Sequence, residues 1–237
     1  MSRHLLPLIA VSSLFAIAPA WAETLPVPPN LIALDSQEGR HLLLASKTST
    51  AYFPLSEQFV TQKTQALCGV ASLVMVLNAL RMPAPASAEL APYNVFDQDN
   101  FFNQQTEAAE PRALIEKMGM SLDMLGGVAR AQGLKAEVHH ATDHGLDAFR
   151  REAVARLGSR DQYVLVNYLR SVLNEKIGGH ISPIAAYETQ SDRFLILDVS
   201  RYKYPPVWVT AKELYAAMNT IAIPEGKITR GYVVLTR

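Results

Sequence analysis

The chain has 237 residues with 22 basic and 22 acidic side chains, so its formal net charge is zero. Hydrophobic residues make up 49% of the chain and charged residues 19%, which is typical of a globular protein with ample apolar material for a core. The balanced charge and the lack of any basic block argue against a partner among nucleic acids.

The N-terminus has the pattern of a secretory signal peptide. Arg3 and His4 precede an apolar run, Leu5 to Ala18, and the run is followed by Ala20-Trp21-Ala22. The run is shorter than the roughly 20 residues of a spanning helix, which disfavours the alternative of an uncleaved anchor. We therefore expect residues 1–22 to be removed and the protein to be exported to the bacterial periplasm, without a membrane attachment.

The next part of the chain is expected to be irregular up to a buried central helix. Pro26, Pro28 and Pro29 favour an extended arm over residues 23–52, with a short helix or strand near Gly39–Leu44. The run that follows Cys68 has two apolar stripes at helical spacing, which predicts a helix that is buried on most sides and ends by Pro83. A loop rich in proline, aromatic and amide side chains follows, to Phe102.

The period then changes from helical to strand-like. Helices are predicted over Ala113–Met118, from Leu122 to Gly133 with Ser121 as the cap, and over Leu146–Leu157, with a strand over Lys135–His140 between them. Strands are predicted over Tyr163–Leu169, Ile181–Tyr187, Phe194–Val199 and Gly231–Leu235, with a helix over Ala211–Met218. Helices first and an antiparallel sheet second indicate an α+β fold.

The single cysteine can be interpreted in three ways. An exported protein meets an oxidising compartment, and one cysteine cannot pair within its own chain. Cys68 is therefore a buried inert residue, an intermolecular partner or a reactive thiol. Its place at the start of a helix favours the thiolate form, because free N–H groups and the helix dipole stabilise a negative charge there.

A predicted hairpin brings a base and a carboxylate together. If its turn is centred near Gln190, opposed residues have numbers that sum to about 380, so His180 lies opposite Ser200 and one pair away from Asp198. His180 and Asp198 then project from the same face. Pro183 can introduce a bulge, which limits the register to a residue or two. Cys68, His180 and Asp198 would form a thiol site with base and orienting group.

A glutamine near Cys68 and a group of three histidines also bear on the chemistry of the site. Gln62 lies six residues before Cys68, so its amide can reach back and join the backbone N–H of Cys68 in stabilising an oxyanion. His139, His140 and His144 suggest zinc, but we expect no metal site because no acidic or cysteine partner is visible at ligand spacing.

Several segments resemble the phytochelatin synthase family. They are Thr61-Gln62, Ala66–Ser72, Met75–Asn78, Gln98–Phe102, Val166–Arg170, Gly178–Pro183, Asp198–Trp208, Ala217–Asn219 and Thr229–Gly231. The resemblance runs from about Phe53 to the C-terminus. It implies three regions: a signal peptide (1–22), an N-terminal arm (23–52) and a catalytic domain of phytochelatin-synthase type (53–237).

The resemblance also implies a fold and a reaction. The fold would be papain-like, with Cys68 as nucleophile, His180 as general base and acid, Asp198 as its orienting carboxylate and Gln62 as oxyanion donor. Arg170 and Arg230 match arginines near the bound γ-glutamylcysteinyl group, where forked cations suit a free carboxylate. The substrate would be glutathione, cleaved at its Cys–Gly bond through a γ-glutamylcysteinyl thioester.

The chain resembles the short bacterial members, in which hydrolysis to γ-glutamylcysteine and glycine dominates over transpeptidation to phytochelatin. No cofactor is expected on the protein, and heavy-metal ions would arrive as glutathione thiolates. The short bacterial members also suggest a homodimer. Two alternatives stay open: an exported peptidase or amidase for other γ-glutamyl or peptide amides, and a catalytically inert binding protein of the same fold.

Overall fold

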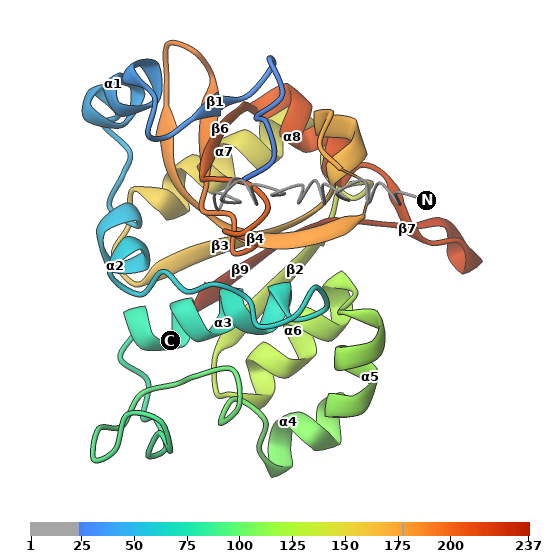
Figure 1. Ribbon diagram of the computed structural model, residues 1–237. Coiled ribbons are helices and arrows are strands. Elements are labelled where there is room, and N and C mark those ends of the chain that lie inside the picture. The colour runs from blue at the N-terminus through green and yellow to red at the C-terminus, as the bar shows by residue number, and fades with distance from the viewer. Residues whose placement is uncertain (1–23, 177) are drawn as a thin grey trace, which may run out of the picture.

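The computed structural model describes residues 24–176 and 178–237 (Figure 1). The expected signal peptide, residues 1–22, lies outside the described residues. Among the residues described, no helix is long and apolar enough to cross a bilayer.

One antiparallel sheet organises the molecule. Its strand order is β1-β6-β5-β4-β3-β9-β2, and every neighbouring pair is antiparallel. The strands are β1 Ile32–Ala33, β2 Lys135–His140, β3 Gln162–Leu169, β4 Gly179–Glu188, β5 Arg193–Ile196, β6 Val207–Thr210 and β9 Gly231–Thr236. A small separate hairpin joins β7 Ile221–Ile223 to β8 Ile228–Thr229.

Helices cover both faces of the sheet. The longer helices are α1 Gln37–Ala45, α3 Cys68–Ala79, α6 Leu122–Ala131, α7 Leu146–Leu157 and α8 Ala211–Met218. The shorter ones are α2 Tyr52–Glu57, α4 Gln104–Ala109, α5 Arg112–Met118 and the 3₁₀ turns η1 Arg170–Leu173 and η2 Glu225–Lys227. Figure 1 shows α3 and α6 on one side of the sheet and α7 and α8 on the other. The α+β class is confirmed.

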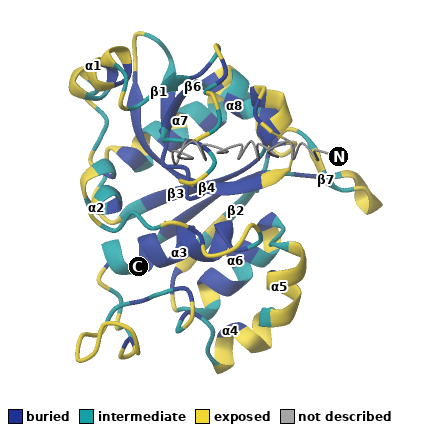
Figure 2. Ribbon diagram, viewed as in Figure 1, coloured by how far each residue is buried: buried dark blue, intermediate teal, exposed yellow. Residues whose placement is uncertain are grey.

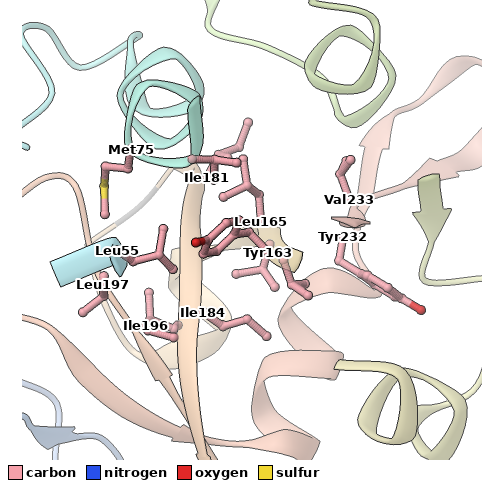
Figure 3. Packing of buried hydrophobic residues seen from close by; sticks show 14 of the residues in the cluster. Leu55, Met75, Tyr163, Leu165, Ile181, Ile184, Ile196, Leu197, Tyr232 and Val233 are labelled. Atoms are coloured by element: carbon pink, nitrogen blue, oxygen red, sulfur yellow. The ribbon is translucent and has the colours of Figure 1, made fainter. Parts of the chain in front are cut away.

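The central strand β4 lies between these two layers. All its residues except Gly179 are buried, and it contacts α3 on one face and α7 on the other. A strand covered on both faces is expected to be apolar without alternation, which holds for residues 184–187 of β4, whereas His180, Ser182 and Glu188 are buried polar residues. Figure 2 shows the same burial along α3, and Figure 3 shows Met75 of α3 and Ile181 of β4 within the core between them.

The helix that carries Cys68 is confirmed, with one adjustment. Residues 68–77 are all buried, as the two apolar stripes predict. The helix ends at Ala79, before Pro83, because the chain turns at Arg81, which has a positive φ of 50°. Proline is therefore not the residue that ends it.

The expected N-terminal arm, as far as the structure describes it (residues 24–52), pairs with the sheet. Its strand β1 pairs with β6, and Leu25 N donates to Lys203 O at 2.8 Å. The ambiguous stretch near Gly39 is helical and forms α1, which packs against β4. This segment therefore contributes an edge strand and a covering helix.

Candidate active site

Cys68 is the first residue of α3 and is 7% exposed. Leu67, at the N-cap position, has no side chain that could accept from the free N–H groups of the first turn. Ser72 Oγ donates to Cys68 O at 2.8 Å and lies 3.2 Å from Ile181 O on β4. The start of the helix is thereby held against the strand that carries His180.

The sheet brings an imidazole and a carboxylate to this thiol. His180 on β4 is 3% exposed and lies close enough to Cys68 to lower the pKa of its thiol. Its Nε2 lies 2.8 Å from Asp198 Oδ1 and 2.9 Å from Ser182 Oγ. Because Nε2 faces Asp198, Nδ1 is the ring nitrogen left for the sulfur. The three predicted residues thus meet in one place.

The hairpin register explains the meeting. Ile184 pairs with Ile196, and Leu197 N donates to Pro183 O at 3.0 Å; both pairs sum to 380, as predicted. The register shifts by one between Ile184 and Ala186, so the bulge lies beyond Pro183, away from His180. The predicted register holds as far as Pro183 and Leu197. Strand β5 ends at Ile196 and not at the predicted Val199, so His180 and Asp198 lie beyond the part of the hairpin whose strands pair with each other.

The environment favours charged forms of all three groups. Burial opposes a thiolate at Cys68, but the hydrogen bond and charge of His180 and the backbone N–H groups of Ile181 and Gly69 lower its pKa. Burial likewise opposes an imidazolium at His180, yet the Asp198 carboxylate raises the pKa of that imidazole. Burial would raise the pKa of Asp198, but His180 and Arg170 lower it to about 2.

Arg230 lines the cavity beside the thiol. This cavity of about 440 Å³ is bounded by Cys68, His180, Arg230 and the side chains of Met118 and Met120, among others. Nη1 of Arg230 donates to Thr220 Oγ1 and Ile221 O, both at 2.9 Å, and its other end lies near Gly179. Burial lowers the pKa of this guanidinium, as expected for a cation with no acidic contact among its hydrogen bonds.

Arg170 does not line the cavity beside Cys68, where a residue that binds substrate is expected. Its side chain is 2% exposed, and its guanidinium donates to the carboxylates of Asp198 and Glu175. These carboxylates belong to the protein, so direct binding of a substrate carboxylate by Arg170 has no support from its contacts.

Gln62 lies close to the site in a hydrogen-bonded loop. Its Nε2 donates to Thr64 O at 2.6 Å and to Tyr202 Oη at 3.2 Å, and Ser200 Oγ donates to its Oε1 at 2.6 Å. Ser200 N in turn donates to Asp198 Oδ1 at 2.8 Å. Gln62 is therefore tied to the Asp198 loop, and its role as oxyanion donor stays a prediction.

The reason given against a metal at His139 is wrong. Glu137 and Glu152 bring carboxylates to within 4 Å of His139 Nε2, because Glu137 shares a strand face with it and Glu152 comes from α7. Arg156 pairs with both carboxylates, at 3.3 and 3.2 Å. These contacts form an ion-pair cluster between β2 and α7, with the two acids already matched by a fixed cation.

Sequence reasoning missed the polar residues around His180 and Asp198. Ser182 contacts both His180 and Val199 N, and Glu175 contacts Arg170. Ser182 is two residues from His180 on the same strand face, so strand alternation could have found it. Glu175 lies in a turn, where the sequence gives no such signal.

Comparisons with known proteins agree with this geometry. A family model for phytochelatin synthase matches residues 22–232, which includes the segment expected to be an arm. A protein of Lotus japonicus named glutathione gamma-glutamylcysteinyltransferase 1 is 35% identical over 225 residues, covering 94% of this chain and 43% of the relative. One of Arabidopsis thaliana with the same name is 34% identical and covered to 45%.

A glutathione gamma-glutamylcysteinyltransferase of Schizosaccharomyces pombe is 30% identical over 212 residues, 88% of this chain and 50% of the relative. The chain thus spans about half the length of the curated relatives that it matches. The matched region contains the thiol, the imidazole, the carboxylate and the adjoining cavity. On this agreement of sequence and site, the chain belongs to the phytochelatin synthase family.

Proposed function

We propose that the protein cleaves the Cys–Gly amide of glutathione through a thioester on Cys68. The single observation that carries the proposal is the buried Cys68–His180–Asp198 arrangement, with 2.8 Å between His180 Nε2 and Asp198 Oδ1. The names of the relatives, glutathione gamma-glutamylcysteinyltransferases, support glutathione as the substrate. The proposal concerns the activity of this chain, which matches about half of each relative.

The first half-reaction forms the acyl-enzyme. The thiolate of Cys68 attacks the carbonyl carbon of the substrate's cysteinyl residue, and the C=O electrons move to oxygen. The backbone N–H of Cys68, with the Gln62 amide, would stabilise that oxyanion. The imidazolium of His180 gives its proton to the glycine nitrogen, the C–N bond breaks, and glycine leaves.

The second half-reaction releases the acyl group. Neutral His180 takes a proton from water or from the amino group of a second glutathione as that nucleophile attacks the thioester carbon. The C–S bond then breaks, and Cys68 leaves as a thiolate beside the His180 imidazolium, which restores the starting state. The products are γ-glutamylcysteine with water, or phytochelatin with glutathione. Asp198 stabilises the imidazolium at each stage, since its low pKa keeps it ionised.

Arg230 would bind the free α-carboxylate of the γ-glutamyl group. It lines the cavity next to Cys68, and its Nη1 donates hydrogen bonds to Thr220 and Ile221. Loss of charge at this residue should therefore raise KM for glutathione.

We further propose export to the periplasm, from the signal-peptide pattern of residues 1–22. Heavy-metal ions would enter the reaction as part of the substrate, as glutathione thiolates, because the chain has one cysteine and the proposed reaction uses it as nucleophile. A homodimer is the expected assembly, by analogy with the short bacterial members.

The test is glycine release from glutathione by the purified protein. Wild type should release glycine and accumulate a γ-glutamylcysteinyl adduct on Cys68, seen by mass spectrometry of quenched samples, and Cys68→Ala should do neither. Ordinary dipeptides assayed alongside separate a glutathione enzyme from a general peptidase. Glycine release equal to that of the Cys68→Ala control would refute the proposal.

A further inference from the structure

A buried guanidinium contacts both oxygens of the Asp198 carboxylate, including the one that faces His180. Nη2 of Arg170 lies 3.0 Å from Asp198 Oδ1 and 2.7 Å from Oδ2, while His180 Nε2 lies 2.8 Å from Oδ1. Both oxygens of Asp198 therefore interact with a cation. The rotation of the carboxylate, and with it the direction of the His180 ring, depends on where this guanidinium is held.

The guanidinium is itself fixed from several directions. Nη1 donates to Glu175 Oε2 at 2.5 Å. Its carbon lies 5.3 Å from the ring centroid of Tyr204 and 5.9 Å from that of Tyr168. Glu175 N donates to Arg170 O and Arg170 N donates to Gly178 O, both at 3.1 Å. Residues 175 and 178, which lie between β3 and β4 shortly before His180, thus make hydrogen bonds with the backbone or side chain of Arg170.

Among the described residues, the buried side chain of Glu175 has one hydrogen-bond partner, Arg170. Its side chain is fully buried, and Oε1 has no hydrogen-bond partner among the described residues. Burial, as the largest effect, raises the pKa of this carboxyl. A buried acid that is half satisfied is costly, so its contact with Arg170 must offset that cost.

The same contacts argue against a direct role in binding substrate. Arg170 is 2% exposed and both of its terminal nitrogens are engaged. The cavity that reaches it has a volume of about 150 Å³, against about 440 Å³ for the cavity beside Cys68 and Arg230. Its ion-pair partners are two carboxylates of the protein, Asp198 and Glu175.

We infer that Arg170 and Glu175 are a positioning pair for the triad: Glu175 holds Arg170, Arg170 holds the Asp198 carboxylate, and that carboxylate orients His180 towards Cys68. The pair acts through Asp198 and touches neither substrate nor the reacting sulfur. This inference rests on the proposed thiol chemistry, and it divides the two arginines of the family resemblance into one that positions the triad and one that binds substrate.

Two pairs of variants separate geometry from charge. Arg170→Lys keeps the positive charge but cannot donate in a fork to two carboxylates. Glu175→Gln keeps an acceptor for Nη1, whereas Glu175→Leu removes it without altering the chemistry of Arg170 or Asp198 themselves. Arg230→Lys is the matched control in the cavity. Circular dichroism and thermal unfolding establish that each variant is folded before kinetics are compared.

The first readout is steady-state cleavage of glutathione. We expect Arg170→Lys and Glu175→Leu to lower kcat by about tenfold or more, below the roughly 10⁴-fold known for loss of a triad carboxylate function, with KM unchanged within about twofold. Glu175→Gln should stay within about threefold of wild type. Arg230→Lys should raise KM instead.

The second readout needs no substrate, so it is independent of the proposed function. The rate of Cys68 alkylation by iodoacetamide between pH 5 and 9 reports the thiolate, which the oriented imidazolium stabilises. The titratable groups that affect this rate are His180, Asp198, Glu175 and Tyr168, besides Cys68. Arg170→Lys and Glu175→Leu should shift the pH midpoint of alkylation upward. At a fixed pH below the midpoint, each unit of this shift lowers the rate of alkylation tenfold.

Slower alkylation in both variants, with Glu175→Gln near wild type, supports the inference even if glutathione proves not to be the substrate. Wild-type alkylation together with a raised KM in Arg170→Lys would show that Arg170 binds substrate directly, and overturns it. Wild-type behaviour of Glu175→Leu in both assays also overturns it.

Discussion

Replacing Asp198 by asparagine should make the free energy of unfolding of the protein less sensitive to acid. The pKa of Asp198 falls from 3.8 to about 2 on folding, because His180 and Arg170 outweigh the effect of burial. Each tenfold change in proton affinity is worth about 1.4 kcal/mol, so ionised Asp198 stabilises the folded state by about 2 kcal/mol at neutral pH. Asp198→Asn loses this contribution.

The sign fixes the pH window. A carboxyl whose pKa is lowered on folding stabilises the protein fully above pH 4, and this contribution disappears as the pH falls towards 2. The difference in free energy of unfolding between wild type and Asp198→Asn should therefore be about 2 kcal/mol or more at pH 7, where the variant also leaves Arg170 partly unpaired, and should shrink between pH 4 and pH 2.

Urea unfolding followed by tryptophan fluorescence measures this difference, since Trp208 is fully buried in β6. Asp147→Asn is the control, because the side chain of Asp147 is 79% exposed and its ion pair is worth little. A difference between wild type and Asp198→Asn that stays constant from pH 7 to pH 2.5 would refute the electrostatic reasoning.

Other substitutions test separate parts of the structure. Gln62→Ala should lower kcat by about 10²- to 10³-fold with KM little changed if its amide stabilises the oxyanion, and a kcat near wild type would contradict that role. Ser121→Ala removes the side chain that accepts from the first turn of α6 and should cost about 1 kcal/mol in urea unfolding. Gly231→Ala would place a Cβ 2.0 Å from His139 O, so it should cost about 3 kcal/mol or more, whereas Gly127→Ala meets nothing within 4 Å and should be neutral or slightly stabilising.

Elements with a strong local period could be read from the sequence. The predicted bounds of Lys135–His140, Leu146–Leu157 and Ala211–Met218 coincide with β2, α7 and α8. Each has a periodic apolar face, and α8 also has Thr210 as a side-chain cap. The hairpin register next to His180 was predictable as well, because a turn rich in polar residues fixes the pairing of the strands beside it.

Short elements were missed where the local signal is weak. The strand β6, four residues long, follows two prolines and gains its place from pairing with β5 and β1. The helix α4 had a usable signal, since Asn103 and Thr106 form a capping box, but its six residues have little apolar periodicity.

The role of Arg170 was beyond sequence reasoning. Its partners are five and 28 residues away, and the sequence does not show that two carboxylates converge on one buried guanidinium. A motif can indicate that an arginine matters to a site. Whether it faces the substrate or a protein carboxylate depends on packing.

The order of strands in the sheet has a consequence for biosynthesis. Within residues 24–176 and 178–237, the last strand, β9, lies between β3 and β2, and β2 pairs with β9 alone. Residues 135–140 therefore cannot pair with another strand until residues 231–236 have been synthesised and have left the ribosome. Until synthesis has reached that point the nascent chain cannot complete its sheet, so it stays in an incompletely folded form that chaperones can bind.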